Sequence, residues 1–117
     1  MIRVYGIKNC DSVKKALSFF KKHNIEYELF DFKTQALPCQ KITYWLQKVD
    51  INKLFNTRST TYRNLKLKEM SLSDEQKAEW LCHENLLIKR PVIEFDDKVI
   101  VGYNEEEYIR QFNKEFL

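Results

Sequence analysis

The sequence predicts one α/β domain over residues 1–117, in which a βαβ unit and a ββα unit form the core and a helical insertion separates them. Three observations predict this fold. Short stretches rich in Ile, Val, Tyr and Phe lie near both ends of the chain, and apolar residues at helical spacing lie between them. With only two glycines and two prolines, the chain has no linker, repeat or low-complexity tract to divide it.

The first unit is predicted from the first 32 residues. Residues 2–5 read as a strand that ends at Gly6, and residues 26–32 read as a second strand. Between them lies one apolar face of an amphipathic helix: Val13, Ala16, Leu17 and Phe20. The residues able to cap its start are Asn9, Asp11 and Ser12, and Asn24 is suited to its end.

The middle of the chain, approximately residues 37–86, is predicted to be a helical insertion. Pro38 suits a first helical turn, and an apolar stripe at helical spacing follows it: Cys39, Ile42, Trp45, Leu46 and Val49. After a polar loop, Ser73 and Gln76 form a capping box that begins a helix reaching about His83.

The last unit is predicted to be two strands and a helix. Residues 92–95 and 99–101 read as strands joined by a turn at 96–98. Asn104 caps a final helix whose first turn holds three glutamates, and its predicted buried face comprises Tyr108, Ile109, Phe112 and Phe116. The order βαβ, helical insertion, ββα is that of a thioredoxin- or glutaredoxin-like core.

The charge and hydropathy of the chain limit the kinds of partner and the cellular compartment that we expect. A formal net charge of +3 permits a small anionic ligand but does not predict a nucleic-acid binder. The basic residues Arg58, Arg63, Lys66 and Lys68 form only a short segment. No apolar stretch approaches the roughly 20 residues needed to span a membrane, and the N-terminus lacks the apolar core of a signal peptide. We therefore expect a cytoplasmic protein with no membrane partner.

The three cysteines do not have the spacing of a metal site or a disulfide framework. In a reducing compartment all three are expected to be free thiols, and we expect no metal and no bound cofactor. Cys39 and Cys82 lie on apolar faces of their predicted helices, which favours core or half-buried positions over a redox role.

Cys10 is the strongest candidate for chemistry. It lies between the first strand and the first helix, where unpaired backbone N–H groups and the positive end of the helix dipole favour a thiolate. Lys14, one turn into the helix, adds positive charge. The alternative is an inert cysteine that only packs, but its place in the chain favours a nucleophile. Val13 occupies the position of a second cysteine in a CxxC pair, so any redox cycle needs an outside thiol or a distant cysteine.

Two further segments carry candidate binding residues. Residues 56–63 offer hydrogen-bond donors suited to an oxyanion or a carboxylate, or alternatively form a loop that satisfies its own backbone. Arg90 precedes Pro91, which belongs at the first position of a strand and is compatible with a cis peptide bond. Arg90 could equally be a solvated surface charge, and His23 and His83 are expected to be surface or capping residues.

Four segments in order resemble the arsenate-reductase-like family, which also contains the regulator Spx, and the small YffB-like branch resembles the chain most. They are residues 5–16, 56–63, 87–91 and 101–103. The resemblance implies a thioredoxin-like fold with a helical insertion, a cis bond before Pro91, Arg90 opposite the Cys10 loop, and Cys10 as nucleophile.

In arsenate reductases of this family the cysteine attacks arsenate, glutathione with glutaredoxin regenerates it, and three arginines hold the oxyanion. Arg90 falls on one of those arginine positions. Asn56 falls on another, with Arg58 two residues on, and Gly102 falls on the third.

The resulting hypothesis is a glutathione-linked thiol reductase or arsenate-reductase-like oxidoreductase, with glutathione as co-substrate and glutathione or glutaredoxin as partner. The catalytic residues would be Cys10, Lys14 and Arg90. The residues expected to bind a small anionic or thiol substrate are Asn9, Arg58, Thr60, Thr61, Arg63 and Pro91. The alternative is a non-enzymatic Spx-like regulator that binds the C-terminal domain of the RNA polymerase α subunit, although Val13 removes the CxxC switch of the well-known members.

Overall fold

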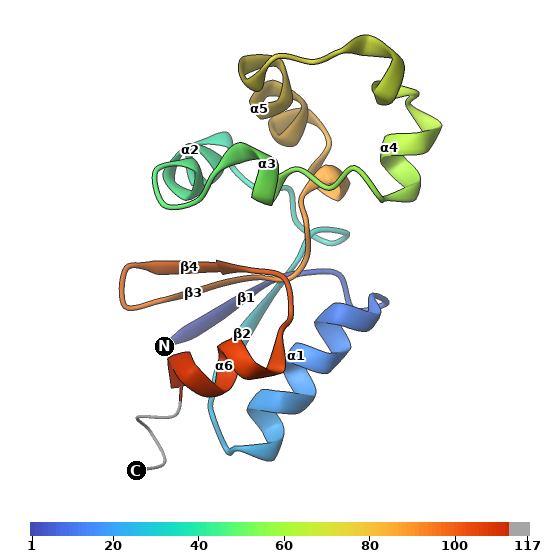
Figure 1. Cartoon of the computed structure of the whole chain (residues 1–117). Coiled ribbons are helices and arrows are strands. Elements are labelled where there is room, and N and C mark those ends of the chain that lie inside the picture. The colour runs from blue at the N-terminus through green and yellow to red at the C-terminus, as the bar shows by residue number, and fades with distance from the viewer. Residues whose placement is uncertain (113–117) are drawn as a thin grey trace.

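The structure, a computed structural model, describes residues 1–112 and consists of a four-stranded sheet between two groups of helices (Figure 1). The first unit comprises β1 (Ile2–Gly6), α1 (Asp11–Lys22) and β2 (Tyr27–Asp31). The insertion comprises α2 (Cys39–Leu46), α3 (Ile51–Leu54), α4 (Thr60–Asn64), the 3-10 helix η1 (Leu67–Met70), α5 (Asp74–His83) and the 3-10 helix η2 (Asn85–Leu87). The last unit comprises β3 (Val92–Phe95), β4 (Lys98–Val101) and α6 (Glu105–Phe112).

The sheet has the strand order β2-β1-β3-β4, with β1 and β2 parallel and the other pairs antiparallel. The parallel pair needs a crossover, which α1 supplies. The antiparallel pair β3–β4 needs only a two-residue turn, and Asp96 and Asp97 adopt the positive φ values of 45° and 61° that such a turn requires. This arrangement confirms the predicted thioredoxin-like fold.

The alternation of side chains along the strands divides the interior into two cores. In β1, Val4 faces α1 and α6 whereas Tyr5 faces the insertion, and in β3 Ile93 and Val92 divide in the same way. The helix-side core is mostly aromatic: Phe19, Phe20, Tyr108 and Phe112 with Val4, Ala16 and Ile93. Figure 1 shows α1 and α6 on one face of the sheet and the insertion on the other.

Helix α1 ends as predicted but begins differently. At its end Asn24 has a φ of 55°, and the amide of Ile25 donates to the Phe20 carbonyl at 2.8 Å, as in a Schellman motif. At its start the N-cap residue is Cys10 itself, with no side-chain capping bond. The prediction that Asn9, Asp11 or Ser12 caps this helix was therefore wrong. Asn9 lies one residue before the N-cap position, and Asp11 and Ser12 are already within the helix.

The insertion is more divided than its sequence pattern indicated. The stripe from Cys39 to Val49 does not form one helix, because the chain turns after Leu46 and Asp50 caps the short α3. Ser73 and Gln76 form the predicted capping box. The predicted polar loop before it contains α4 and η1.

The final helix begins where it was predicted, since the Asn104 side chain accepts a bond from the amide of Glu107 at 3.0 Å. Tyr108 and Phe112 are buried, but Ile109 is 42% exposed, so its assignment to the buried face was wrong. Phe116 lies outside the described residues. Within residues 1–112, every helix is too short or too polar to cross a membrane.

Candidate functional site

The predicted site residues come from three segments that meet at one end of the sheet. Because β1 and β3 are antiparallel, with Tyr5 paired to Val92, the loop after β1 lies beside the segment that enters β3. The first of these segments carries Cys10, and the second carries Arg90 and Pro91. In Figure 1 both meet at the end of the sheet from which α1 begins.

The third segment, residues 54–56, runs beside residues 87–89. The amide of Asn56 donates to the Leu87 carbonyl at 2.8 Å, and the amide of Lys89 donates to the Leu54 carbonyl at the same distance. Phe55 and Ile88 form the β-bridge between these two bonds. The segment of residues 56–63 therefore starts next to the chain that leads into Arg90.

Gly6 sets the position of the Cys10 loop. A Cβ at Gly6 would lie 2.6 Å from Cγ2 of Val13, closer than two carbon atoms can approach. The absence of a side chain at this position lets the first turn of α1 pack directly on the end of β1. Val13 occupies the position of the second cysteine of a CxxC pair. Its side chain is fully buried and packs against the end of β1.

Cys10 is a half-buried free thiol at the N-cap of α1. Its carbonyl accepts the first helical bond, from the amide of Lys14 at 2.9 Å. The thiol itself makes no capping bond, so the amides of the first turn remain available to a thiolate or to a bound anion. Lys14 is exposed and lies one turn further along the same helix.

The peptide bond between Arg90 and Pro91 is cis, as the resemblance implied. Pro91 is buried, and its carbonyl accepts a bond from the amide of Gly102 at 2.7 Å. Gly102 has a φ of 86°, and its own carbonyl accepts a bond from the buried Tyr108 hydroxyl at 2.8 Å. These bonds hold the segment that follows Arg90 to the segment between β4 and α6.

Arg90 is half-buried, and its guanidinium is only partly satisfied. Nη1 donates to the Leu86 carbonyl at 3.3 Å, whereas Nε is buried with no hydrogen-bond partner among the described residues. A buried charged donor without an acceptor costs free energy. The guanidinium is half-buried as a whole, so this segment places a partly accessible cation at the end of the sheet.

Residues 56–63 largely satisfy one another. The Arg63 guanidinium donates to the Arg58 carbonyl at 3.0 Å and to Oγ1 of Thr60 at 3.2 Å, and the Asn56 side chain accepts from the Arg58 amide. Ser59, a residue that the sequence analysis did not single out, is buried and caps α4. These bonds are of the kind expected for a loop that satisfies its own backbone, and the Arg58 side chain remains exposed. Binding of a substrate by Arg58, Thr60, Thr61 and Arg63 stays a prediction.

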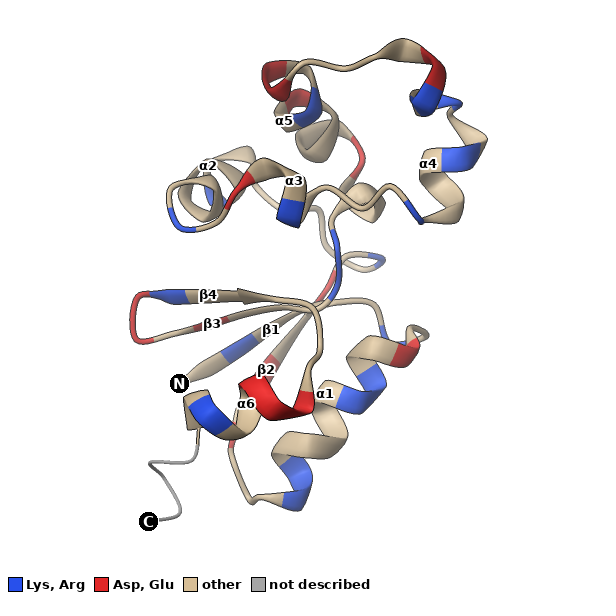
Figure 2. Cartoon of the chain, in the orientation of Figure 1, with Lys and Arg blue, Asp and Glu red and all other residues tan. Residues whose placement is uncertain are grey.

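Positive charge lies on both sides of this end of the sheet. Figure 2 shows Lys and Arg positions on α1 and in and around α4. The acidic residues near them are Asp11 in the first turn of α1, Asp31 opposite Gly6 at the end of β2, and Glu69 in η1. The acidic residues of α6 are in its first turn, on the other side of the molecule from α4. Within α1 itself, basic residues outnumber the single acidic residue, Asp11.

The prediction of three free thiols was wrong. Cys39 and Cys82 form a disulfide that joins the first residue of α2 to the last turn of α5, with their Cα atoms 5.1 Å apart. Cys39 is exposed, so its assignment to the apolar stripe was also wrong, and Cys82 is half-buried. Their 43-residue separation in sequence gave no signal of the pairing, which depends on how α2 packs against α5.

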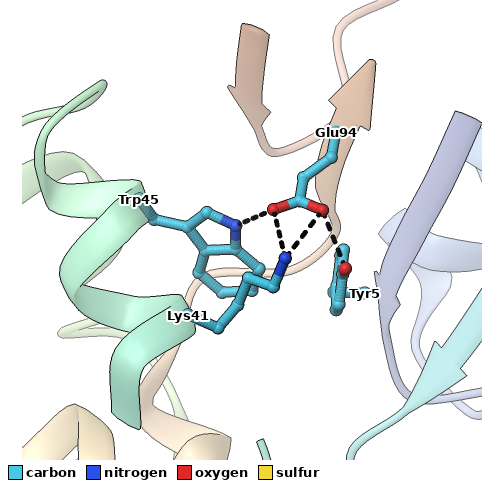
Figure 3. Close-up of polar contacts among 4 residues, drawn as sticks. All are labelled: Tyr5, Lys41, Trp45 and Glu94. Atoms are coloured by element: carbon cyan, nitrogen blue, oxygen red, sulfur yellow. Dashed lines mark hydrogen bonds and ion pairs between the residues drawn. The ribbon is translucent and has the colours of Figure 1, made fainter. Parts of the chain in front are cut away.

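A second feature that sequence reasoning missed is a polar cluster around Glu94 (Figure 3). The Glu94 carboxylate accepts bonds from the Tyr5 hydroxyl at 2.8 Å and from Nε1 of the fully buried Trp45 at 2.6 Å. Lys41 forms an ion pair with it at 3.2 Å. Burial, together with the bond to the Glu94 carboxylate and its negative charge, raises the pKa of Tyr5 to about 12. The cluster attaches α2 to the sheet. In the sequence, the only sign of the cluster was the acidic residue Glu94 within an apolar strand.

Residues 1–112 contain no cluster of three His, Cys, Asp or Glu side chains that could hold a metal ion. His83 is exposed at the end of α5, and the His23 ring packs against Phe19 with the centroids 4.4 Å apart and the rings tilted by 51°. The chemistry of the described site therefore centres on the Cys10 thiol and the Arg90 guanidinium.

Comparison with known proteins agrees with this geometry. The profile of the ArsC family matches residues 5–111, which include all three converging segments. The chain belongs to the ArsC family.

Family members of different kinds resemble the chain over most of its length. An uncharacterized protein of Haemophilus influenzae is 44% identical over 96% of this chain and 99% of its own. A protein of Oceanobacillus iheyensis named global transcriptional regulator Spx 2 is 34% identical over 95% of this chain and 82% of its own. The solved structure of a YFFB protein superposes with a TM-score of 0.87 at 27% identity and covers 94% of this chain and 97% of that one. The chain is thus similar both to a YffB protein and to a regulator.

Proposed function

We propose that the protein is a thiol-dependent reductase of the ArsC family in which Cys10 is the nucleophile and glutathione is the co-substrate. The observation that carries the proposal is the placement of a free thiol at the N-terminus of α1, across the sheet end from a cis-proline segment that bears Arg90. Helix N-termini and nearby cations favour the reactive thiolate.

The reaction proceeds by two thiol–disulfide exchanges. The Cys10 thiolate attacks the glutathione sulfur of a mixed disulfide, a Cys10–glutathione disulfide forms, and the other thiol leaves with the electron pair. Glutathione then attacks the glutathione sulfur of that disulfide, which releases oxidised glutathione and regenerates the thiolate. Because Val13 leaves no second cysteine in the first turn of α1, the second thiol comes from outside the chain.

Arg90 has the role of orienting the anionic part of the substrate. Its guanidinium is half-buried at the end of the sheet, and the N–H groups of its accessible part are suitable donors for a glutathione carboxylate. The other arginine positions of the family hold Asn56 and Gly102, so the site has fewer cations for a small oxyanion than an arsenate reductase has. We therefore favour a glutathione mixed disulfide over arsenate, in the cytoplasm, where glutathione is kept reduced.

The test is turnover of the mixed disulfide of glutathione and 2-mercaptoethanol, coupled to glutathione reductase. We expect the unaltered chain to turn over this substrate and Cys10→Ser to lose the activity completely, because no other free thiol lies in this site. Cys82→Ser is the matched control and should retain activity, since Cys82 is on α5. Equal turnover by Cys10→Ser and the unaltered chain would refute the proposal.

A second candidate is a regulator similar to Spx, and the observation that favours it is the likeness to a relative of that name over 95% of this chain. It would act by binding the C-terminal domain of the RNA polymerase α subunit, without turnover. A pull-down of purified chain with that domain tests it. Binding with no turnover of any glutathione disulfide would favour the regulator, and turnover without binding would favour the reductase.

A further inference from the structure

We propose that the Cys39–Cys82 disulfide is a second thiol-exchange site, which low-molecular-weight thiols open by attacking the sulfur of Cys39. The disulfide is separate from the Cys10 site, since it joins two helices of the insertion and Cys10 lies between the first strand and α1. Disulfides in reducing compartments are usually transient and catalytic or redox-sensing, which is the behaviour proposed for this pair.

The two cysteines of the pair differ in exposure. Cys39 is exposed at the first position of α2, whereas Cys82 is half-buried and packs against the insertion-side core. Thiol–disulfide exchange depends on which sulfur an attacking thiolate can reach. A small thiol therefore reaches Cys39 first.

The place of Cys39 in its helix favours the second step. A thiolate of the small thiol attacks Sγ of Cys39, the disulfide breaks, and the electron pair leaves with Sγ of Cys82, which takes a proton from water. A second small thiolate then attacks the small thiol's own sulfur in this mixed disulfide. Cys39 leaves as a thiolate at the N-terminus of α2, where the helix dipole stabilises it. Two small thiols are thereby oxidised to their disulfide, and the protein disulfide is reduced to two thiols.

The structure also explains why opening would be reversible. The segment before α2 is held to the end of α5 by a second link, in which the Leu37 amide donates to Oδ1 of Asn85 at 3.0 Å. The same Asn85 side chain donates to the Leu81 carbonyl at 2.9 Å. Because Ile42 of α2 and Leu81 of α5 are buried in one core, we expect α2 and α5 to stay packed when the disulfide opens. The two thiols therefore remain close together, and the disulfide can form again.

The experiment uses the full chain with Cys10→Ser, so its result does not depend on the proposed reductase. The protein is oxidised with oxidised glutathione, treated with reduced glutathione without denaturant, blocked with N-ethylmaleimide and weighed by mass spectrometry. We expect no blocked thiol before reduction, two after it, and none again after reoxidation. Two blocked thiols in the oxidised protein, or opening only in urea, would overturn the proposal.

The position of the first mixed disulfide shows which sulfur is attacked. In the oxidised Cys10→Ser chain, reaction with reduced glutathione is stopped early with acid, and the glutathionyl group is located by peptide mass spectrometry. It should be found on Cys39 at least about tenfold more often than on Cys82. An equal distribution, or more adduct on Cys82, would contradict attack at Cys39.

Discussion

The two sulfur sites of this chain occupy similar places in their helices but have different surroundings. Cys10 is the N-cap of α1, and Cys39 is the first residue of α2. Cys10 has no bonded partner and lies at the sheet end that also holds Arg90, whereas the exposed Cys39 is bonded to the half-buried Cys82 of α5. Both cysteines therefore lie at a helix N-terminus, and they differ in what lies opposite: the Arg90 segment for Cys10 and Cys82 for Cys39.

The supports of the two sites also differ. The Cys10 loop is positioned directly by the sheet, because Val13 of α1 packs closely against Gly6 of β1. Helix α2, which carries Cys39, is attached to the sheet through the polar cluster of Glu94, Trp45 and Lys41 (Figure 3). A change in that cluster should therefore affect the disulfide site and spare the Cys10 site.

The largest effect is expected from Glu94→Ala, which leaves Trp45 and Lys41 without their acceptor. It also leaves the buried Tyr5 hydroxyl and Trp45 indole unsatisfied, at about 1–3 kcal/mol each, which urea unfolding would measure. The exposed Glu28→Ala on β2 is the control and should stay within about 0.5 kcal/mol of the unaltered chain. In the folded protein, re-formation of the Cys39–Cys82 disulfide should slow while alkylation of Cys10 is unchanged. A loss no larger than that of Glu28→Ala would show that the cluster does not hold α2.

The same cluster predicts a dependence of stability on high pH. Burial and the Glu94 carboxylate favour the neutral form of Tyr5, so its pKa is about 12 in the folded protein against about 10 in the unfolded chain. This contribution is present below pH 10 and is lost as the pH rises from 10 towards 12, by about 2–3 kcal/mol in all.

The measurement is the free energy of unfolding of the unaltered chain and of Tyr5→Phe across that alkaline range. Tyr5→Phe should lack this part of the decline, whereas other tyrosines titrate in both proteins. Parallel curves for the two proteins would contradict the assignment.

The fold was predictable because local patterns determine it. Val4 and Tyr5 alternate between two cores, Asn24 ends α1 in the left-handed conformation, and Asn104 caps α6. The position of Cys10 followed from the junction of a strand and a helix. Such features depend on neighbours within a few residues.

The missed features depend on packing between distant segments. The Cys39–Cys82 pairing needs α2 and α5 side by side, and the Glu94 cluster joins β3 to residues about 50 positions earlier. The pairing of residues 54–56 with residues 87–89 also joins segments that are far apart in the sequence. No spacing rule along one chain encodes these contacts, so they required the structure.

Arg90→Gln should weaken the Cys10 site without affecting the disulfide. A charge-assisted hydrogen bond contributes about 1.5–3 kcal/mol, so KM for the glutathione mixed disulfide should rise at least about tenfold with a smaller change in kcat. Arg110→Gln on α6, where Arg110 pairs with Glu107, is the remote control. An unchanged KM would show that Arg90 does not contact the substrate.

The smallest effect is expected from Lys14→Glu. Reversing one exposed charge in the first turns of α1 should slow alkylation of Cys10 by iodoacetamide at neutral pH by about two- to fivefold, because such charges contribute about 0.3–1 kcal/mol. Lys21→Glu, in the last turn of the same helix, is the matched control. Equal alkylation rates in the two variants would show that the charge of Lys14 does not affect Cys10.

The most direct test of the central claim is to trap the Cys10–glutathione disulfide. The Cys39→Ser/Cys82→Ser chain, in which Cys10 is the single cysteine, is treated with oxidised glutathione and mapped by peptide mass spectrometry. We predict one glutathionyl group on Cys10, with its release by reduced glutathione and slower formation in Arg90→Gln. A folded protein that forms no adduct, or one whose rate is the same in Arg90→Gln, would contradict the account.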